Sequence, residues 1–391
     1  MTSSQHQSAT GARGRNVAVW AAMLSCLLAF AAIGASAMAT PKTATNIKAA
    51  GLQKDVDALV AAGAPGVILL VRDGNHTVRL SAGLGNVARK TPMRANDHFK
   101  IASLTKSYTA AVVLQLVGEG KLGLGDTVER RLPGLVPNGN KITIRQLLNH
   151  TSGLADFEVN PRYLKPYLNG NFGYYWAPRQ LVKMGVSQKP LFAPGTDYAY
   201  SNTNYVLAQL IVEKVTGRTL GAELKRRIFE PLHLGETSYP TKPGLPSPYA
   251  HGYKLLGPPP AVDVTGLSPS LAPGSGAIIS TALDVADFYR GLLSGKLLKP
   301  QQMTAMKTVV SVRTGKIAAS GPGEGLGVAR QPSCGGWGRG GEFPGYEAFA
   351  ISSADGRRQT VLMMNQDRST APKRAVVLFD KLVAKAFCAG A

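Results

Sequence analysis

The sequence has few of the residues that mark metal-dependent enzymes, and it lacks several hydrolase signatures. Its 391 residues include only 3 cysteines and 6 histidines, and the histidines stand apart from one another. A zinc site is therefore not expected. There is no G-x-S-x-G nucleophile elbow, no H-E-x-x-H motif and no phosphate-binding glycine loop. The enzyme classes that depend on those motifs are therefore excluded. No metal or cofactor is predicted.

Acidic residues are also scarce, with 23 Asp and Glu against 44 Lys and Arg. The content of 44% hydrophobic residues and the lack of a long low-complexity tract indicate a chain that folds. The basic residues are scattered and no nucleic-acid-binding motif is present, so a nucleic-acid partner is not expected. For an exported protein, the positive charge favours loose attraction to an anionic cell wall.

The start of the chain has the pattern of a signal peptide. Arg13 and Arg15 precede an apolar stretch over residues 17–32, and small residues follow it. A single membrane anchor is the alternative, but the small residues and the lack of a basic flank favour export. The sequence predicts a signal peptide over residues 1–39 and a secreted, extracellular chain over residues 40–391, without membrane attachment after cleavage.

Two of the cysteines, Cys334 and Cys388, lie in the predicted mature chain. An even pair in an oxidising compartment predicts a disulfide between them. Two free buried thiols are the alternative, which is disfavoured because secreted proteins seldom keep unpaired cysteines.

Apolar patterning predicts strands near both ends of the mature chain and helices between them. Strands are expected over residues 67–72, 346–352 and 360–364, and helices over residues 52–62, 103–119, 144–149, 204–216, 220–232 and 373–387. The fold class is therefore α/β (α+β), an antiparallel sheet built from both termini and flanked by helices, with an inserted mainly helical region. The sheet region would take residues 40–125 and 265–391, and the helical region residues 126–264.

Chemistry is indicated by an S-x-x-K tetrad from Ser103 to Lys106 at the start of a predicted helix, where the spacing puts hydroxyl and ammonium on one face. A lysine in a partly dehydrated site lowers the cost of removing the proton of a serine nucleophile. Tyr200-Ser201-Asn202 follows a Pro-Gly turn. We expect nearby cations to lower the pKa of the Tyr200 phenol so that it acts as a base, and the Asn202 amide to orient a substrate carbonyl.

These segments together resemble the family of class C β-lactamases and Streptomyces-type D-alanyl-D-alanine carboxypeptidases, over nearly the whole mature chain. Residues 99–106 resemble the nucleophile segment, residues 145–154 the segment that leads into the next loop, and residues 194–217 the tyrosine segment. The resemblance implies a serine β-lactamase/penicillin-binding-protein-like hydrolase that works through an acyl-enzyme. The predicted catalytic residues are Ser103, Lys106 and Tyr200.

The third family motif, usually His or Lys followed by any residue and Gly, reads Arg339-Gly340-Gly341 here. Arginine keeps the positive charge but adds bulk and a forked donor, and we expect its guanidinium to point at the nucleophile. The resemblance also implies an oxyanion hole made by the backbone N–H groups of Ser103 and Glu342. The predicted substrate-binding residues are Asn202, Arg339, Gly341 and Glu342.

The function ranked first is D-alanyl-D-alanine carboxypeptidase on peptidoglycan-type peptides, where Arg339 or Arg330 would bind the terminal carboxylate. Esterase or β-lactamase activity of the same family is the alternative, since all use an acyl-enzyme. β-Lactams are expected as covalent inhibitors and the chain as a monomer. A reading from another class is a catalytically inactive cell-wall-binding protein, which the intact Ser103 and Lys106 oppose. His150 is expected to have a structural hydrogen-bonding role.

Overall fold

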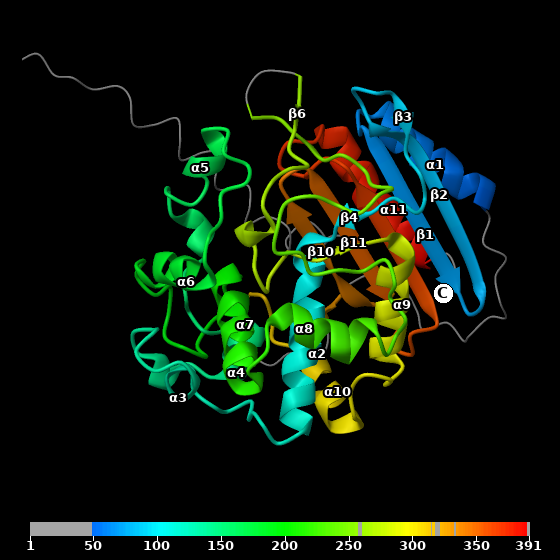
Figure 1. The fold of residues 1–391 in the computed structure, drawn as a ribbon. Helices are drawn as coiled ribbons and strands as arrows, with labels where there is room; N and C mark the ends of the chain where they lie inside the picture. The colour runs from blue at the N-terminus through cyan, green and yellow to red at the C-terminus, as the bar shows by residue number, and fades with distance from the viewer. Residues whose placement is uncertain (1–48, 257–259, 314, 317–320, 332–333, 389–391) are drawn as a thin grey trace, which may run out of the picture. The chain divides into compact units, whose positions relative to one another are not determined.

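One antiparallel sheet organises the computed structural model, which describes residues 49–256, 260–313, 315–316, 321–331 and 334–388 (Figure 1). Its strand order is β3-β2-β1-β12-β11-β10-β9-β8. The strands are β1 (Gly66–Asp73), β2 (His76–Asn86), β3 (Thr91–Pro92), β8 (Gly323–Glu324), β9 (Ala329–Arg330), β10 (Trp337–Phe343), β11 (Tyr346–Ser352) and β12 (Arg358–Met364). Because β1 pairs with both β2 and β12, the first hairpin joins the last strands edge to edge. The predicted sheet built from both termini is confirmed.

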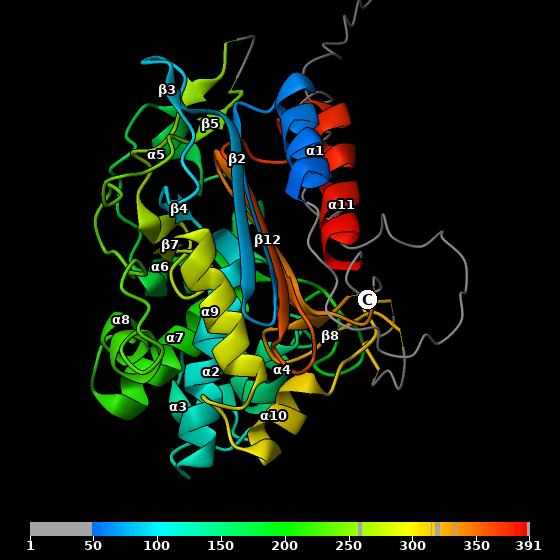
Figure 2. The ribbon, with the colours of Figure 1, turned by 90° about the vertical axis from the view of Figure 1, so that its right-hand side faces the viewer.

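The centre of the sheet is apolar on both faces because helices cover both. Strand β1 reads GVILLVRD and is buried along almost its whole length, as expected for a strand covered on two sides. Helices α1 (Ala49–Ala61) and α11 (Lys373–Cys388) pack on one face, whereas α2 (Thr105–Gly118) and α9 (Ala282–Leu293) pack on the other (Figure 2).

The segment between the two parts of the sheet is mainly helical, as predicted. It contains α3 (Val128–Arg131), α4 (Ile144–Leu148), α5 (Lys165–Leu168), α6 (Pro178–Val186), α7 (Asn202–Thr216) and α8 (Leu220–Leu224), and α10 (Pro300–Lys307) follows α9. The helix expected over residues 220–232 is wrong in part, since α8 passes into a π-helical turn over Lys225–Phe229. Helices α6 and α10 were not predicted, although each begins with a proline in its first turn, a residue favoured there.

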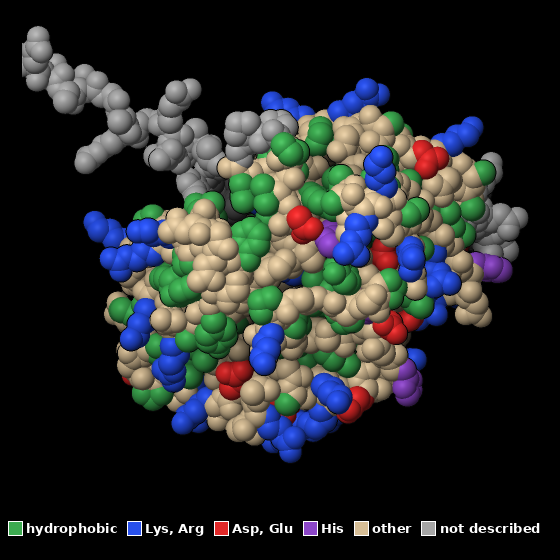
Figure 3. Space-filling view, turned by 45° about the horizontal axis from the view of Figure 1, so that its top comes forward, with side chains coloured by type: hydrophobic (Ala, Val, Ile, Leu, Met, Phe, Trp, Pro, Cys, Tyr) green, Lys and Arg blue, Asp and Glu red, His purple; other side chains and the backbone are tan. Residues whose placement is uncertain are grey.

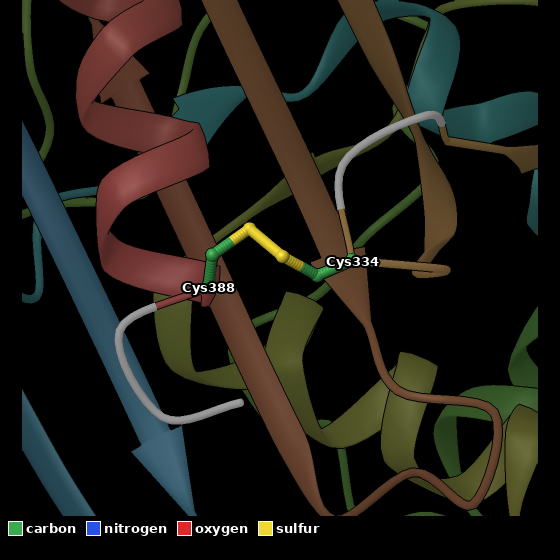
Figure 4. The surroundings of a disulfide bond; sticks show 2 residues. All are labelled: Cys334 and Cys388. Carbon is green, nitrogen blue, oxygen red and sulfur yellow. A yellow bond between two sulfur atoms is a disulfide. The ribbon is translucent and has the colours of Figure 1, made fainter. Parts of the chain in front are cut away.

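Cys334 and Cys388 are bonded to each other (Figure 4). Cys334, just before β10, and Cys388, at the end of α11, have Cα atoms 5.8 Å apart. The bond closes a loop with a sequence separation of 54 residues, for which the chain-entropy model gives a stabilisation of about 4 kcal/mol. The disulfide predicted from the sequence is present in the structure.

The predicted signal peptide, residues 1–39, lies outside the described residues. Within the described part of the chain, no helix has both the length and the apolar character that a membrane span requires. Figure 3 shows Lys and Arg side chains spread over one face of the molecule rather than gathered in one patch.

Candidate active site

The serine of the S-x-x-K tetrad follows a sharp change of backbone direction. Strand β4 (Phe99–Lys100) pairs with β7 (Ile279–Ser280), and a short 3-10 turn over Ala102–Leu104 leads into α2. Ala102 has φ 51°, a left-handed conformation that is costly for a residue with a Cβ and is found at functional sites. Ser103 itself is partly exposed.

Lys106 lies one turn further along and is completely buried. Its Nζ is 3.1 Å from Ser103 Oγ, 2.6 Å from Asn202 Oδ1 and 3.1 Å from the carbonyl oxygen of Ser275. Burial, followed by the charge of Arg339, holds the pKa of the Lys106 amine well below its usual range. The three oxygens around Nζ can accept the three N–H groups of an ammonium. A neutral amine can also serve this site, with two N–H groups donated to the carbonyl oxygens and its lone pair accepting the serine hydroxyl.

Tyr200 contacts the same serine oxygen from another element. Its hydroxyl oxygen is 2.7 Å from Ser103 Oγ, and its ring centroid lies 4.7 Å from Lys106 Nζ. The prediction of a lowered phenol pKa is wrong: burial raises the pKa of Tyr200, and this exceeds the lowering caused by Arg339 and by the hydrogen bond with Ser103. Tyr200 is therefore a protonated phenol in the resting site.

Asn202, the first residue of α7, is used differently from the prediction. Its Nδ2 donates to Asp156 Oδ2 and to Glu158 Oε1, both at 3.0 Å, and its Oδ1 accepts from Lys106. Both amide N–H groups are thus bound within the protein, so they do not orient a substrate carbonyl. Asn202 joins the lysine to two carboxylates, and neither carboxylate was identified from the sequence.

Arg339 lies beside Tyr200, with its guanidinium carbon 5.6 Å from the ring centroid, but it is not a free cation. Its guanidinium donates to both carboxylate oxygens of Glu324, at 2.6 and 3.4 Å, and both side chains are almost fully buried. We expected the charge of Arg339 to be free to bind a substrate. Instead, the carboxylate of Glu324, on the edge strand β8, neutralises it. The sequence offered no signal for Glu324, because only the pairing of β8 with β9 and of β9 with β10 brings it close.

The glycine of the third motif lies against the backbone of Ser103. A Cβ on Gly341 would lie 2.6 Å from the Ser103 backbone nitrogen and 2.9 Å from the Ile101 carbonyl oxygen, so only glycine allows β10 to approach this closely. Glu342 is the next residue, and alternation along the strand directs its side chain to the opposite face, where Oε1 accepts from the Ser369 backbone N–H at 3.2 Å. Its carboxylate therefore does not point at Ser103.

His150 packs beside the tyrosine and makes hydrogen bonds within the protein. Its ring centroid is 4.5 Å from that of Tyr200, and its Nδ1 accepts from the Ser201 backbone N–H at 3.2 Å. Burial lowers the pKa of the imidazole well below its usual range, so the ring is neutral at pH 7. Among the described residues, no three His, Cys, Asp or Glu side chains lie close enough together to bind a metal ion.

The fold and the site together define a class of protein. An antiparallel sheet flanked by helices carries a serine hydroxyl that contacts both a buried lysine amine and a tyrosine hydroxyl. This arrangement suits nucleophilic attack on a carbonyl through an acyl-enzyme. It is the arrangement of a serine hydrolase.

The chain belongs to the family described as Beta-lactamase, which it matches over residues 52–385. It is 27% identical over 342 residues to penicillin-binding protein 4* of Bacillus subtilis, covering 80% of this chain and 70% of that protein. A D-stereospecific amidohydrolase from Streptomyces superposes with a TM-score of 0.79 at 35% identity, covering 88% of this chain and 99% of that one. The D-amino acid amidase from Ochrobactrum anthropi superposes with a TM-score of 0.76 at 26% identity, covering 86% and 96%.

Proposed function

We propose that the protein is a serine amidohydrolase that cleaves amide bonds next to D-configured residues through an acyl-enzyme on Ser103. The observation that carries this proposal is the contact of Ser103 Oγ with both Lys106 Nζ, at 3.1 Å, and the Tyr200 hydroxyl, at 2.7 Å. Amide hydrolysis needs a base for the attacking hydroxyl and an acid for the departing nitrogen. Lys106, whose amine has a lowered pKa, can act as the base, and the protonated Tyr200 phenol can act as the acid.

In the proposed first step, neutral Lys106 takes the proton of Ser103 while Oγ forms a bond to the substrate carbonyl carbon. The carbonyl oxygen becomes an oxyanion, which the backbone N–H groups of Ser103 and Glu342 would stabilise. The close approach of Gly341 to the Ser103 nitrogen supports this role for the β10 backbone.

In the second half of acylation, the Tyr200 phenol protonates the nitrogen of the departing amine and the C–N bond breaks. The proton that Lys106 holds restores the phenol, so acids and bases balance over the step. Water then attacks the carbonyl carbon of the acyl-enzyme while Lys106 accepts a proton from it. The ester C–O bond breaks, and Lys106 returns this proton to Ser103 Oγ.

The substrate class is supported by the names of the solved neighbours, a D-stereospecific amidohydrolase and a D-amino acid amidase. The ion pair of Arg339 with Glu324 agrees with this choice, because it leaves no excess positive charge there for a substrate carboxylate. D-Alanyl-D-alanine carboxypeptidase, ranked first from the sequence, is the second candidate. It is favoured by the penicillin-binding names among the relatives and requires a cation that Arg339 does not freely offer.

The test is a substrate panel with the Ser103→Ala variant as the blank. It contains D- and L-aminoacyl amides, acyl-D-Ala-D-Ala peptides, a chromogenic cephalosporin and short-chain aryl esters. We expect the D-aminoacyl amides to be hydrolysed faster than their L-enantiomers. Release of D-alanine from the acyl-D-Ala-D-Ala peptides as the fastest reaction would favour the carboxypeptidase instead. A folded protein that turns over no substrate and forms no covalent adduct at Ser103 would favour the inactive binding protein.

We also propose that the enzyme acts outside the cell. The disulfide between Cys334 and Cys388 supports this location, because such bonds persist in oxidising compartments. N-terminal sequencing of the protein recovered from culture medium tests it, and the expected start lies close to residue 40. Recovery of an uncut chain from the cell interior alone would contradict export.

A further inference from the structure

The amide of Asn202 has a fixed orientation in the site. A carboxylate only accepts hydrogen bonds, so the amide nitrogen must face Asp156, and the amide oxygen must face Lys106. The backbone N–H of Asn202 also donates to Asp156 Oδ2, at 2.9 Å. Asp156 therefore holds Asn202 by two hydrogen bonds on the side away from the lysine.

Burial raises the pKa of the Asp156 carboxyl, whereas its hydrogen-bond partners favour the ionised form. Its Oδ1 accepts from the Glu158 backbone N–H at 3.1 Å, and its Oδ2 accepts two N–H groups from Asn202. All three partners are donors, an arrangement that a protonated carboxyl would not match. The carboxylate also lies at the N-terminus of the 15-residue helix α7, where the helix dipole favours negative charge.

We propose that Asp156 is a positioning residue for Lys106 and acts through Asn202: its carboxylate polarises the amide, whose oxygen holds the lysine amine and stabilises the ammonium formed when Ser103 loses its proton. This inference rests on the proposed function of Lys106 as the base. The chain of contacts runs from carboxylate to amide to amine to nucleophile. Its logic is electrostatic stabilisation of a charge that develops during the reaction.

Several charged groups act on Lys106, and they oppose one another. Arg339 lowers its pKa, whereas Asp156, Glu158 and Glu324 raise it. The rings of Tyr200 and Tyr205 also face its Nζ, with centroids at 4.7 and 5.5 Å. Asp156 and Glu158 are both joined to Nζ through Asn202, but Asp156 accepts two hydrogen bonds from Asn202 and Glu158 accepts one.

The experiment measures the rate of Ser103 labelling by a fluorophosphonate as a function of pH, by intact-protein mass spectrometry. In Asp156→Asn the lost negative charge destabilises the Lys106 ammonium, so the acid limb of the profile should move to lower pH by about one unit. The plateau rate should fall about tenfold or more, because the base is weaker. A purely structural role would lower the folded fraction without moving the limb.

Three further variants sharpen the result. Glu158→Gln removes the other carboxylate that contacts Asn202, and it should move the limb less than Asp156→Asn does, because Glu158 accepts one hydrogen bond from Asn202 and Asp156 accepts two. Glu230→Gln, which removes an exposed charge of the π-helical segment's C-cap, should change nothing. Asp156→Ser keeps a capping oxygen without the charge, and it serves if Asp156→Asn does not fold.

The outcomes separate the inference from the proposed function. No labelling of the wild-type protein would contradict the role of Ser103 itself. Normal labelling of the wild type with an unmoved limb in both Asp156 variants would overturn the positioning role alone. If the acid limb moves in Glu158→Gln but not in Asp156→Asn, the carboxylate that acts on Lys106 is Glu158, and the proposal for Asp156 is overturned.

Discussion

Two buried lysines, Lys100 and Lys106, precede and follow Ser103 in the sequence and differ in their surroundings. Lys100 is 4% exposed and donates to the Leu267 carbonyl oxygen at 2.7 Å, with its Nζ 4.7 Å from the centroid of the Phe343 ring. Burial lowers the pKa of Lys100 to about 7. Lys106 is also buried and its pKa is also lowered, but its Nζ contacts Ser103 Oγ.

The comparison separates the effect of burial on the pKa of a lysine amine from the effect of its hydrogen-bond partners on its role. Burial alone depresses the pKa of a lysine amine, and it does so at both positions. Only Lys106 has the nucleophile and the Asn202 amide as neighbours. We conclude that a depressed pKa is necessary for the proposed base but does not identify it, and that hydrogen-bond contact with the nucleophile does.

The largest expected effect comes from making the same substitution at both lysines. Lys106→Met should lower the rate of Ser103 labelling by about 10³-fold, because the base is lost, whereas Lys100→Met should stay within about threefold of the wild type, since it touches no group on Ser103. Labelling rates with a fluorophosphonate measure both, and circular dichroism checks the folds. Equal losses in the two variants would contradict the assignment of Lys106 as the base.

The second effect concerns the other group on the serine oxygen. Tyr200→Phe removes the hydroxyl while the ring stays against Lys106, and amide hydrolysis should fall about 10²-fold because the departing nitrogen loses its acid. Aryl esters, whose leaving groups need no proton, should be affected much less. Comparison of kcat for matched amides and esters measures this. Equal losses on the two substrates would make Tyr200 a second base and weaken the assignment to Lys106.

The third effect tests whether charges add to burial at Lys106. Arg339→Met should move the acid limb of labelling to higher pH by about one unit, because a cation that lowers the pKa of Lys106 is removed. The double variant Arg339→Met/Glu324→Gln should return close to the wild-type profile, since the two charges act in opposite directions. A double variant that behaves like the single one would show that Glu324 does not balance Arg339.

The fourth effect concerns stability rather than rate. The pKa of Lys100, about 7 in the folded protein, lies below its ordinary value of about 10.4, so between these values the unfolded chain binds more protons. The penalty of burying Lys100 is therefore full below pH 7 and is lost as the pH rises toward 10, with a slope of up to about 1.4 kcal/mol per unit. Lys100→Met should stabilise more at pH 6.5 than at pH 9.5 in urea titrations. A pH-independent difference would mean that Lys100 keeps its charge when buried.

The sequence predicted the fold and the grouping of Ser103 with Lys106 and Tyr200. The apolar strands near both ends of the chain and the S-x-x-K spacing can be read from short segments, and the contact of Ser103 with Lys106 and Tyr200 agrees with the matched segments. The partners of Arg339 and Asn202 depend instead on distant elements that the sheet and the loop before α7 bring together. Glu324 is isolated in a short strand and carries no motif, so its pairing with Arg339 could not be predicted.

The direction of the Tyr200 pKa shift failed for a related reason. Counting nearby cations predicts a fall, but the net shift depends on how much water the fold excludes from the phenol and on whether a carboxylate already matches the cation. Neither quantity can be read from the chain. The same limit applies to Asn202. The sequence predicted that its amide binds a substrate carbonyl, but in the fold its N–H groups donate to Asp156 and Glu158.

The most direct test of the account is the pH dependence of Ser103 labelling in the wild-type protein, because its central claim is that Lys106 is a neutral base at neutral pH. The labelling rate should rise with pH and reach its plateau well below pH 10, as a lysine with a strongly lowered pKa requires. A rate that continues to climb through pH 10, the ordinary range of lysine and tyrosine, would contradict it.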